Sequence, residues 1–430
     1  MIIVDKALEK RAAESRPILF GMFGAGWIAK GILNQGRYLR GIRCAAVCNR
    51  TIDKAVRAVR SAGITSLKVV GSSAELDQSL RKGITAITDD PVVLCESEIL
   101  ECLIEVTGHV EYGATVTTLA IEHGKDMVLM NAELDGTIGP LLKWKADKAG
   151  VLISGCDGDQ PAVQMNLYRF VRSLELNPLV CGNIKGLQDH YRNPTTQASF
   201  ARTWDQTPEM VTSFADGTKI SFEQAIVANA TGMKVAQRGM IGYEHTGHVD
   251  DLTDRYDVEQ LRELGGIVDY VLGAKPSPGV YVFAEAHDAT QAQYLKYAKL
   301  GDGPLYSFYV PYHLMPFEAP LTVARMVEFG DVAIAPQGGP VVDVVTAAKR
   351  DLHRGETLDG LGGYTTYGLC ENYENVRDQD LLPIGLAEGS VLRRHIPRDE
   401  VISVKDVDYP EGGITHRLRQ QQDEMFPPGT

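Results

Sequence analysis

The chain has 430 residues, enough for two or three domains, and its 44% hydrophobic content is typical of a globular protein with a full core. Its formal net charge of -13 argues against a nucleic-acid surface, which would need a basic patch. A local group of Lys and Arg side chains can still hold an anionic small molecule in an acidic protein.

The seven cysteines include no CxxC pair, which excludes the spacing of a zinc ribbon and of a disulfide framework. Reduced thiols are typical of cytosolic proteins. The amino-terminal stretch 1–16 mixes charged and apolar residues and lacks the apolar run of a secretory signal. No run approaches the length of a membrane span. These features predict a cytoplasmic protein that binds neither membranes nor nucleic acids.

Short apolar runs alternate with helical patterns through the first third of the chain. The runs predict buried parallel strands at 17–24, 42–48, 67–70, 102–106, 126–130 and 151–154. Helices are predicted at 27–40, between Thr51 and Ala62, at 113–124 and at 139–149. This alternation predicts an α/β fold with a doubly wound parallel sheet of the Rossmann type over residues 1–155.

The pattern changes at about residue 156, where polar loops, aromatic residues and charged residues mix. We expect an α+β domain for substrate binding and dimerisation over 156–300, with a strand near 210–214. Residues 301–332 end in a helix that returns to the first domain. Short apolar strands broken by glycine then predict a small β-rich domain over 333–430.

The strongest motif is FGMFGAGWIAKG at 20–31, which has the spacing Gly24-x-Gly26-x-x-Ala29. The first glycine permits a tight turn, and the second removes a side chain where a pyrophosphate must approach. The motif follows a strand and opens a helix, whose first N–H groups favour phosphate. We therefore predict a dinucleotide site. Its contacts are expected from Gly24, Ala25, Gly26, Trp27 and Ile28.

The end of the second strand bears on which dinucleotide binds. An NAD enzyme usually has Asp or Glu there for the ribose hydroxyls, whereas this chain has Asn49 and Arg50. A guanidinium can pair with a 2′-phosphate in a forked geometry, which favours NADP(H), with NAD as the alternative. Thr107, Gly108 and Asn131 follow two later strands and are candidate cofactor contacts, or else ordinary loop caps.

Asp157 and Asp159 follow the last strand of the first domain, in the segment CDGDQP. Two carboxylates one residue apart could bind a divalent metal or hydrogen-bond substrate hydroxyls, and a plain surface turn is the third interpretation. We predict a catalytic role for Asp159, a substrate contact for Asp157, and a possible metal site for the pair.

Cationic and histidine side chains gather in the middle segment. Reduction of a carbonyl needs a proton donor, and cations can also hold a phosphate or carboxylate. Lys185 and Lys219 are the first candidates for catalysis. The candidates for substrate binding are His190, Tyr191, Arg192 and His313. Weaker candidates are Lys234, Arg238, His245 and His248, and solvated loops are the alternative for all of them.

Several segments resemble homoserine-dehydrogenase-like oxidoreductases. They are the early GAG turn, VTGHV at 106–110, VLMNAELD at 128–135, the DGDQP segment, and the GDGP…PLTVAR return at 301–325. Residues 338–410 resemble a SAF-type domain. The combination, with ANATG, SPGVYVFAE and PYHLMPFEAPLTVAR, is similar to 1-deoxy-D-xylulose 5-phosphate reductoisomerase-like proteins. This resemblance implies an NADP(H) enzyme that forms a homodimer through its middle domain.

Two enzymatic hypotheses and one binding hypothesis follow. The first is an oxidoreductase or reductoisomerase acting on a small hydroxy or keto sugar, with a phosphate on the substrate. The second is homoserine dehydrogenase. The third is a non-catalytic protein that binds a nucleotide or a carbohydrate.

Overall fold

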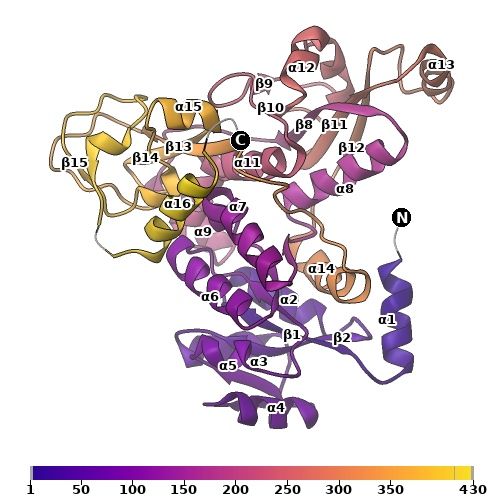
Figure 1. The fold of residues 1–430 in the computed structure, drawn as a ribbon, viewed down its shortest axis with the longest axis vertical. Coiled ribbons are helices and arrows are strands. Elements are labelled where there is room, and N and C mark those ends of the chain that lie inside the picture. Colours follow the sequence, from indigo (N-terminus) through magenta and orange to yellow (C-terminus); the bar gives the residue numbers. More distant parts are fainter. Residues whose placement is uncertain (1–2, 411, 428–430) are drawn as a thin grey trace. The chain divides into compact units, whose positions relative to one another are not determined.

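A computed structural model describes residues 3–410 and 412–427. The chain divides into two compact units (Figure 1). Unit 1 comprises Met1–Asp135, Leu141–Asp159 and Leu314–Ala335. Unit 2 comprises Gly136–Pro140, Gln160–His313 and Pro336–Thr430. The predicted boundaries between three domains stay a prediction, since this division groups residues 336–430 with the middle segment.

Unit 1 is built on a seven-stranded sheet in the order β3-β4-β2-β1-β5-β6-β7. Its strands are β1 (Ile18–Phe23), β2 (Ile42–Cys48), β3 (Leu67–Val69), β4 (Thr85–Thr88), β5 (Cys102–Glu105), β6 (Asp126–Leu129) and β7 (Ile153–Gly155). Every neighbouring pair is parallel. The predicted doubly wound sheet is therefore confirmed.

Helices connect these parallel strands, as right-handed crossovers require. They are α2 (Trp27–Gln35), α3 (Ile52–Ser61), α4 (Ser73–Arg81), α5 (Pro91–Cys95), α6 (Val110–Glu122) and α7 (Ala132–Ala149), with α1 (Val4–Ala13) before the sheet. The returning helix α14 (Met315–Phe329) lies against α2, because a Cβ added at Gly31 would stand 2.6 Å from Pro316. Apolar residues of β1, α2, α3 and α14 share one buried cluster.

Unit 2 contains a five-stranded sheet in the order β12-β11-β8-β10-β9. Its strands are β8 (Asn177–Lys185), β9 (Tyr243–Glu244), β10 (Ile267–Leu272), β11 (Gly279–Glu285) and β12 (Leu305–Val310). Its helices are α8 (Gln160–Ser173), α9 (Pro194–Thr203), α10 (Pro208–Ala215), α11 (Thr218–Thr231), η1 (Val249–Asp254), α12 (Val258–Leu264) and α13 (Ala289–Tyr297). The sheet mixes parallel and antiparallel pairs, which fits the expected α+β character.

The strand predicted near 210–214 is wrong, because these residues lie in α10. Pro208 occupies the first turn, and the Thr207 hydroxyl caps the helix by accepting a hydrogen bond from the Met210 N–H. Both are helix-start signals, and they override the short alternation of polar and apolar residues.

Helix α11 lies in the interior of unit 2, since every residue from Ile220 to Ala230 is buried. Strands β13 (Val342–Ala348) and β14 (Thr366–Asn372) bond to it. Ser221 donates from Oγ to the Gly368 carbonyl at 3.0 Å, and the Asn229 Oδ1 accepts from the Val341 N–H at 2.7 Å. The remaining carboxy-terminal elements are α15 (Tyr373–Asp378), η2 (Ile384–Leu386), β15 (Val391–Leu392), η3 (Val404–Asp406), β16 (Val407–Asp408) and α16 (Ile414–Met425).

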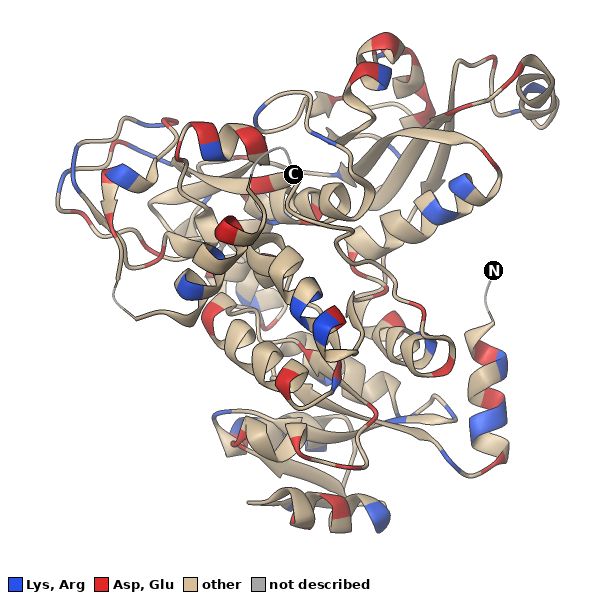
Figure 2. Cartoon of the chain, viewed as in Figure 1, with Lys and Arg blue, Asp and Glu red and all other residues tan. Residues whose placement is uncertain are grey.

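Acidic and basic residues are interspersed along the helices of both units (Figure 2). A binding site for an anion must therefore be located from individual side chains. All seven cysteines are buried thiols without a disulfide. Within the described ranges, no helix combines the length and the apolar character needed to cross a membrane.

Gly182 in β8 gives a test of the packing in the unit 2 sheet. A Cβ at this position would lie 2.1 Å from Cζ of Tyr281, whose ring is fully buried. We expect Gly182→Ala to lower the free energy of unfolding by about 1–3 kcal/mol, because the core has no room to adjust. Gly338→Ala is the control, since nothing lies within 4 Å of its added Cβ. Equal chemical denaturation midpoints for both variants would contradict this packing.

Candidate active site

The glycine turn of unit 1 has the geometry of a dinucleotide cradle. Gly24 has φ +116°, which an L side chain rarely adopts, and its N–H donates to the Cys48 carbonyl at 2.9 Å. Gly26 is the N-cap of α2, and a Cβ added there would meet no atom within 4 Å. The open space at Gly26 is what a pyrophosphate would need, so these residues fit the predicted cofactor.

The turn lies where the strand order reverses. β1 pairs with β2 on one side and with β5 on the other. The two motifs meet there, because the added Cβ of Gly24 would stand 3.1 Å from a Val106 methyl at the end of β5. Thr107 and Gly108 come directly after Val106. Ligands of open α/β sheets bind at such a switch point. The structure therefore brings the Gly24–Gly26 turn close to the segment that leads into Thr107 and Gly108.

Asn49 and Arg50 follow β2, as expected. The Asn49 amide donates to the Thr51 carbonyl at 2.9 Å and shapes the loop. The Arg50 guanidinium lies over the ring of Tyr112 in α6, 5.3 Å from its centroid. This cation–π contact places the exposed guanidinium at the carboxyl edge of the sheet.

Glu105, the last residue of β5, is a buried carboxyl that the sequence reasoning did not select. Its Oε1 accepts from the Thr107 N–H at 2.8 Å and from the Thr107 hydroxyl, while its Oε2 has no hydrogen-bond partner among the residues described. Burial raises the pKa of this carboxyl to about 7, against the opposing hydrogen bonds from Thr107 and Asn131. Asn131 also caps α7 by accepting from the Leu134 N–H at 3.1 Å.

Asp157 and Asp159 have different surroundings within unit 1. Asp157 forms an ion pair with Arg325 at 3.0 Å and accepts from the Thr322 hydroxyl at 3.0 Å. Burial and the negative charge of Asp159 raise the pKa of the Asp135 carboxyl to about 7. Among the described residues, no group of three or more His, Cys, Asp or Glu side chains could hold a metal ion. Arg325 supplies a counter-charge for the Asp157 carboxylate.

Lys185 ends β8 in unit 2, and its ammonium is held by two polar side chains. It forms an ion pair with Glu223 of α11 at 3.0 Å and donates to Oε1 of Gln160, the first residue of α8. Its side chain retains 20% of its accessible surface, while that of Glu223 retains 4%. The ammonium is therefore at the margin of the core, with its counter-charge inside.

The network continues inward from Lys185. Asn183, also on β8, donates to Glu223 at 2.8 Å and accepts from Gln164 of α8. The Gln160 amide donates at 3.4 Å to the carbonyl of Gly279, where β11 begins. Buried polar groups of this kind are costly unless they are hydrogen-bonded, so the network fixes α8, β8, β11 and α11 in one arrangement.

The other predicted residues of unit 2 lie elsewhere. Lys219 is half-buried in the first turn of α11, and His313 lies in the segment after β12. His190 stacks on Tyr367 of β14 with 4.3 Å between ring centroids. The Tyr191 hydroxyl donates to Asp399 at 2.9 Å, and Arg192 pairs with Asp189 at 3.0 Å. His190 and Tyr191 therefore contact the carboxy-terminal segment of this unit.

The weaker candidates from the sequence each lie beside an acidic side chain. Lys234 lies 3.8 Å from Glu374, and Arg238 pairs with Glu371 at 2.6 Å. His245 and His248 lie 3.0 Å from Asp251 and Asp250, respectively. Lys185 is set in a buried polar network with Glu223, Gln160 and Asn183, and this favours it for chemistry.

Part of the chain is similar to a known catalytic domain. Residues 158–319 match the sequence model of a family described as oxidoreductase DRL, catalytic domain. The match includes α8, β8 and α11 and hence the whole Lys185 network. None of the curated proteins matches the chain.

Several solved structures are similar to this chain, at low identity. One is a homoserine dehydrogenase from Thiobacillus denitrificans, with 13% identity, a TM-score of 0.42, and coverage of 90% of this chain and 97% of that one. Another is a putative myo-inositol dehydrogenase from Sinorhizobium meliloti 1021, with 9% identity, a TM-score of 0.40, and coverage of 74% and 92%.

A third is an oxidoreductase from Agrobacterium radiobacter in complex with NAD+, L-tartaric acid and magnesium. Its match has 11% identity and a TM-score of 0.28, and it covers 40% of this chain and 45% of that one. All three likenesses are distant. Two observations on this chain itself carry more weight: the match to an oxidoreductase catalytic domain, and the glycine turn of a Rossmann sheet. Together they identify an NAD(P)-dependent oxidoreductase.

The buried carboxyl of Glu105 predicts a pH-dependent stability. Its pKa in the folded chain is about 7, above the ordinary value of 4.5, so folding favours the protonated form. The stability that this proton contributes is complete below about pH 4.5 and is lost as the pH rises through 7. The charge-free variant Glu105→Gln should therefore gain about 3 kcal/mol over the parent at pH 8 and little at pH 5.

Melting temperatures measured across this range check the prediction, with the exposed Glu98→Gln as the control in the same unit. A gain for Glu105→Gln that does not change between pH 5 and pH 8 would show that the carboxyl titrates normally.

Proposed function

We propose that this oxidoreductase uses NADP(H) and acts on a small hydroxy or keto sugar that carries a phosphate, as a reductase or a reductoisomerase. The observation that carries the proposal is the Lys185 ammonium, paired with Glu223 and Gln160 inside the region that matches an oxidoreductase catalytic domain. The resemblance to 1-deoxy-D-xylulose 5-phosphate reductoisomerase-like proteins supports the choice of substrate.

The cofactor and the proton donor have separate parts in the proposed reaction. The nicotinamide of a dinucleotide, whose pyrophosphate the Gly24–Gly26 turn would hold, would supply or accept the hydride. When a carbonyl is reduced, its oxygen gains negative charge and needs a proton, which Lys185 is suited to donate. Gln160 and Glu223 accept two of the three ammonium N–H groups, which leaves one for a substrate oxygen.

Glu223 keeps Lys185 in its charged form, which is the form that can donate a proton. A buried carboxylate stabilises the ammonium before the reaction, and it accepts a further hydrogen bond from Asn183 at 2.8 Å. The polar partners also hold the long Lys185 side chain in one rotamer, which is the orientation that proton transfer requires.

Several finer assignments belong to the same proposal. Asp159 and Lys219 assist catalysis, while Asp157, His190, Tyr191, Arg192 and His313 contact substrate or shape its loop. A divalent metal at Asp157 and Asp159, a SAF-type domain over 333–430, a homodimer and a cytoplasmic location complete it. The alternative substrate is homoserine, and a hydroxy acid is the broader class.

The cofactor preference can be tested at Arg50. A guanidinium on the 2′-phosphate contributes a charge-assisted hydrogen bond of about 1.5–3 kcal/mol. We expect Arg50→Ser to weaken NADPH binding by about 10- to 100-fold and to change NADH binding little. Fluorescence titration of both cofactors measures this, with the exposed Arg57→Ser on α3 as the control. Equal losses for NADPH and NADH would contradict the assignment of Arg50.

The proposed reaction can be tested by a screen for NADPH oxidation with keto sugars and their phosphates, with and without Mg²⁺. Homoserine with NADP+ is assayed in parallel, and turnover of homoserine alone would replace the proposed substrate. The variant Lys185→Met with Glu223→Gln removes the proton donor without leaving an unpaired buried carboxylate.

We expect this double variant to lower kcat by about 100- to 10,000-fold while the Kd for NADPH is unchanged. Lys296→Met on α13 is the control, since that ammonium pairs with Asp302 on an exposed surface. A kcat within a factor of two of the parent would remove Lys185 from the mechanism.

A further inference from the structure

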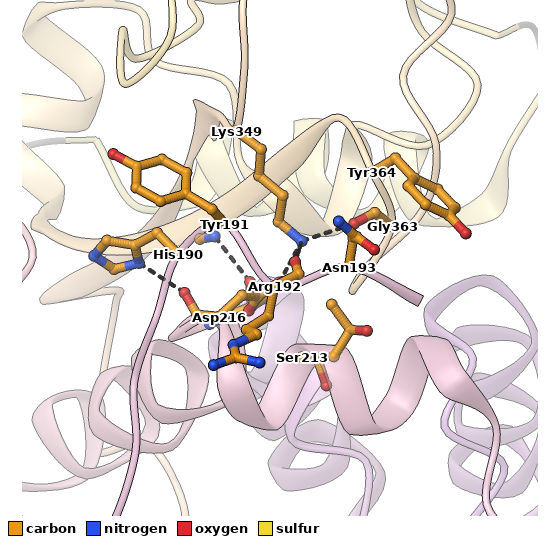
Figure 3. A network of polar contacts seen from close by, with 12 residues as sticks. His190, Tyr191, Arg192, Asn193, Ser213, Asp216, Lys349, Gly363 and Tyr364 are labelled. Atoms are coloured by element: carbon orange, nitrogen blue, oxygen red, sulfur yellow. Dashed lines mark hydrogen bonds and ion pairs between the residues drawn. The ribbon is translucent and has the colours of Figure 1, made fainter. Parts of the chain in front are cut away.

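A buried ammonium joins the carboxy-terminal segment to the loop that follows Lys185 (Figure 3). Lys349 comes directly after β13, and its side chain retains only 3% of its accessible surface. Its Nζ lies 2.8 Å from Oδ2 of Asp216, which is fully buried. The same nitrogen donates to the carbonyl of Arg192 at 2.8 Å and to the carbonyl of Gly363 at 2.7 Å.

These three acceptors belong to three separate segments of unit 2. Asp216 lies between α10 and α11, Arg192 lies in the loop 186–193, and Gly363 lies in the loop 359–365. An ammonium has three N–H donors, and here two of them have carbonyl acceptors, while the ion pair with Asp216 supplies the counter-charge. Because a buried charge is strongly disfavoured unless it is paired, the three segments have to hold this arrangement together.

Further contacts tie the loop 186–193 to the start of α11. The Asp189 N–H donates to the Ala215 carbonyl at 2.7 Å, and the His190 Nδ1 lies 2.7 Å from the Asp216 carbonyl oxygen. Gly217 allows the loop to approach this closely, since a Cβ at this position would stand 2.9 Å from the Gln188 amide nitrogen. The other carboxylate oxygen of Asp216 accepts from the Thr218 N–H at 2.8 Å, which opens α11.

Both segments fixed by Lys349 lead directly to candidate active-site residues. The loop 186–193 begins at the residue after Lys185. Helix α11 carries Lys219 in its first turn and Glu223, the partner of Lys185, one turn later. The spacing between Lys185 and Glu223 therefore depends on how the loop and the helix start are held.

We propose that Lys349 is a positioning residue: through Asp216 and the Arg192 carbonyl, it sets the geometry of the Lys185–Glu223 pair. This gives the carboxy-terminal segment a part in catalysis without contact with substrate. The inference rests on the proposed function for the role of Lys185, but the arrangement of the segments can be tested separately.

The experiment compares the whole chain with the double variant Lys349→Met and Asp216→Asn, which removes both buried charges together. Hydrogen exchange of backbone amides is followed in peptides that cover 186–193 and 216–222. We expect exchange in both segments to be at least tenfold faster in the variant. Exchange within twofold of the parent in both segments would overturn the proposal.

A matched control breaks a different buried ion pair of the same unit. Arg419 of α16 and Asp343 of β13 lie 2.5 Å apart, with 4% and 3% of their side chains exposed. Arg419→Met with Asp343→Asn should leave exchange at 186–193 and 216–222 unchanged. Equal acceleration by the control would show general loosening, and the proposal would fail.

The single variant Asp216→Asn covers the case in which the double variant does not fold. Its amide oxygen can still accept from Lys349, so we expect a threefold or greater rise in exchange at the same two segments. No rise would overturn the proposal as well.

Kinetics separate positioning from a purely structural role. With the sugar phosphate that best supports NADPH oxidation, the Lys349 and Asp216 double variant should lose at least tenfold in kcat at a temperature where it is folded. Its Kd for NADPH should stay within twofold of the parent. An unchanged kcat would overturn the proposal. If the parent turns over no sugar phosphate, the proposed function fails, and the exchange data still decide the role of Lys349.

Discussion

The structure of unit 2 depends on the burial of polar groups beside Lys185. An ammonium at the end of β8 needs a counter-charge, and Glu223 supplies it from the middle of the buried helix α11. A carboxylate in that position must be hydrogen-bonded, which brings in Asn183 and, through it, Gln164. Helix α11 must then be covered on its other sides, and β13 and β14 do this. One charge pair thus links the catalytic region to the carboxy-terminal strands.

Unit 1 depends on a different constraint, which is the close approach of a ligand to the backbone. Gly24 and Gly26 place two residues without side chains in the turn at the switch point of the sheet, and Arg50 lies at the neighbouring strand end over Tyr112. The carboxyls of Glu105 and Asp135, with pKa values raised to about 7, lie in the same unit.

Much of the fold of unit 1 could be predicted from local sequence patterns. The sheet of unit 1 and its glycine turn could be predicted, because they depend on short apolar runs and motif spacing. Lys185 was selected as one cation of the middle segment, but the strand that it ends was not predicted. Glu223, Gln160 and Lys349 were not selected, since their roles come from contacts between distant segments. Glu223 did leave a signal, as an acid within the apolar stretch of α11. The strand predicted at 210–214 is wrong, because the helix start at Thr207-Pro208 outweighs a five-residue alternation of polar and apolar residues.

The central claim is hydride transfer between a nicotinamide and a sugar carbon with Lys185 as proton donor. The most direct measurement is mass spectrometry of the product formed from NADPH deuterated at C4 of the nicotinamide, with the keto sugar phosphate that best supports NADPH oxidation. We expect one deuterium on a sugar carbon of the product: the carbon that bore the carbonyl in the substrate for a reductase, or in the rearranged intermediate for a reductoisomerase. Oxidation of NADPH without deuterium in the sugar product would contradict it.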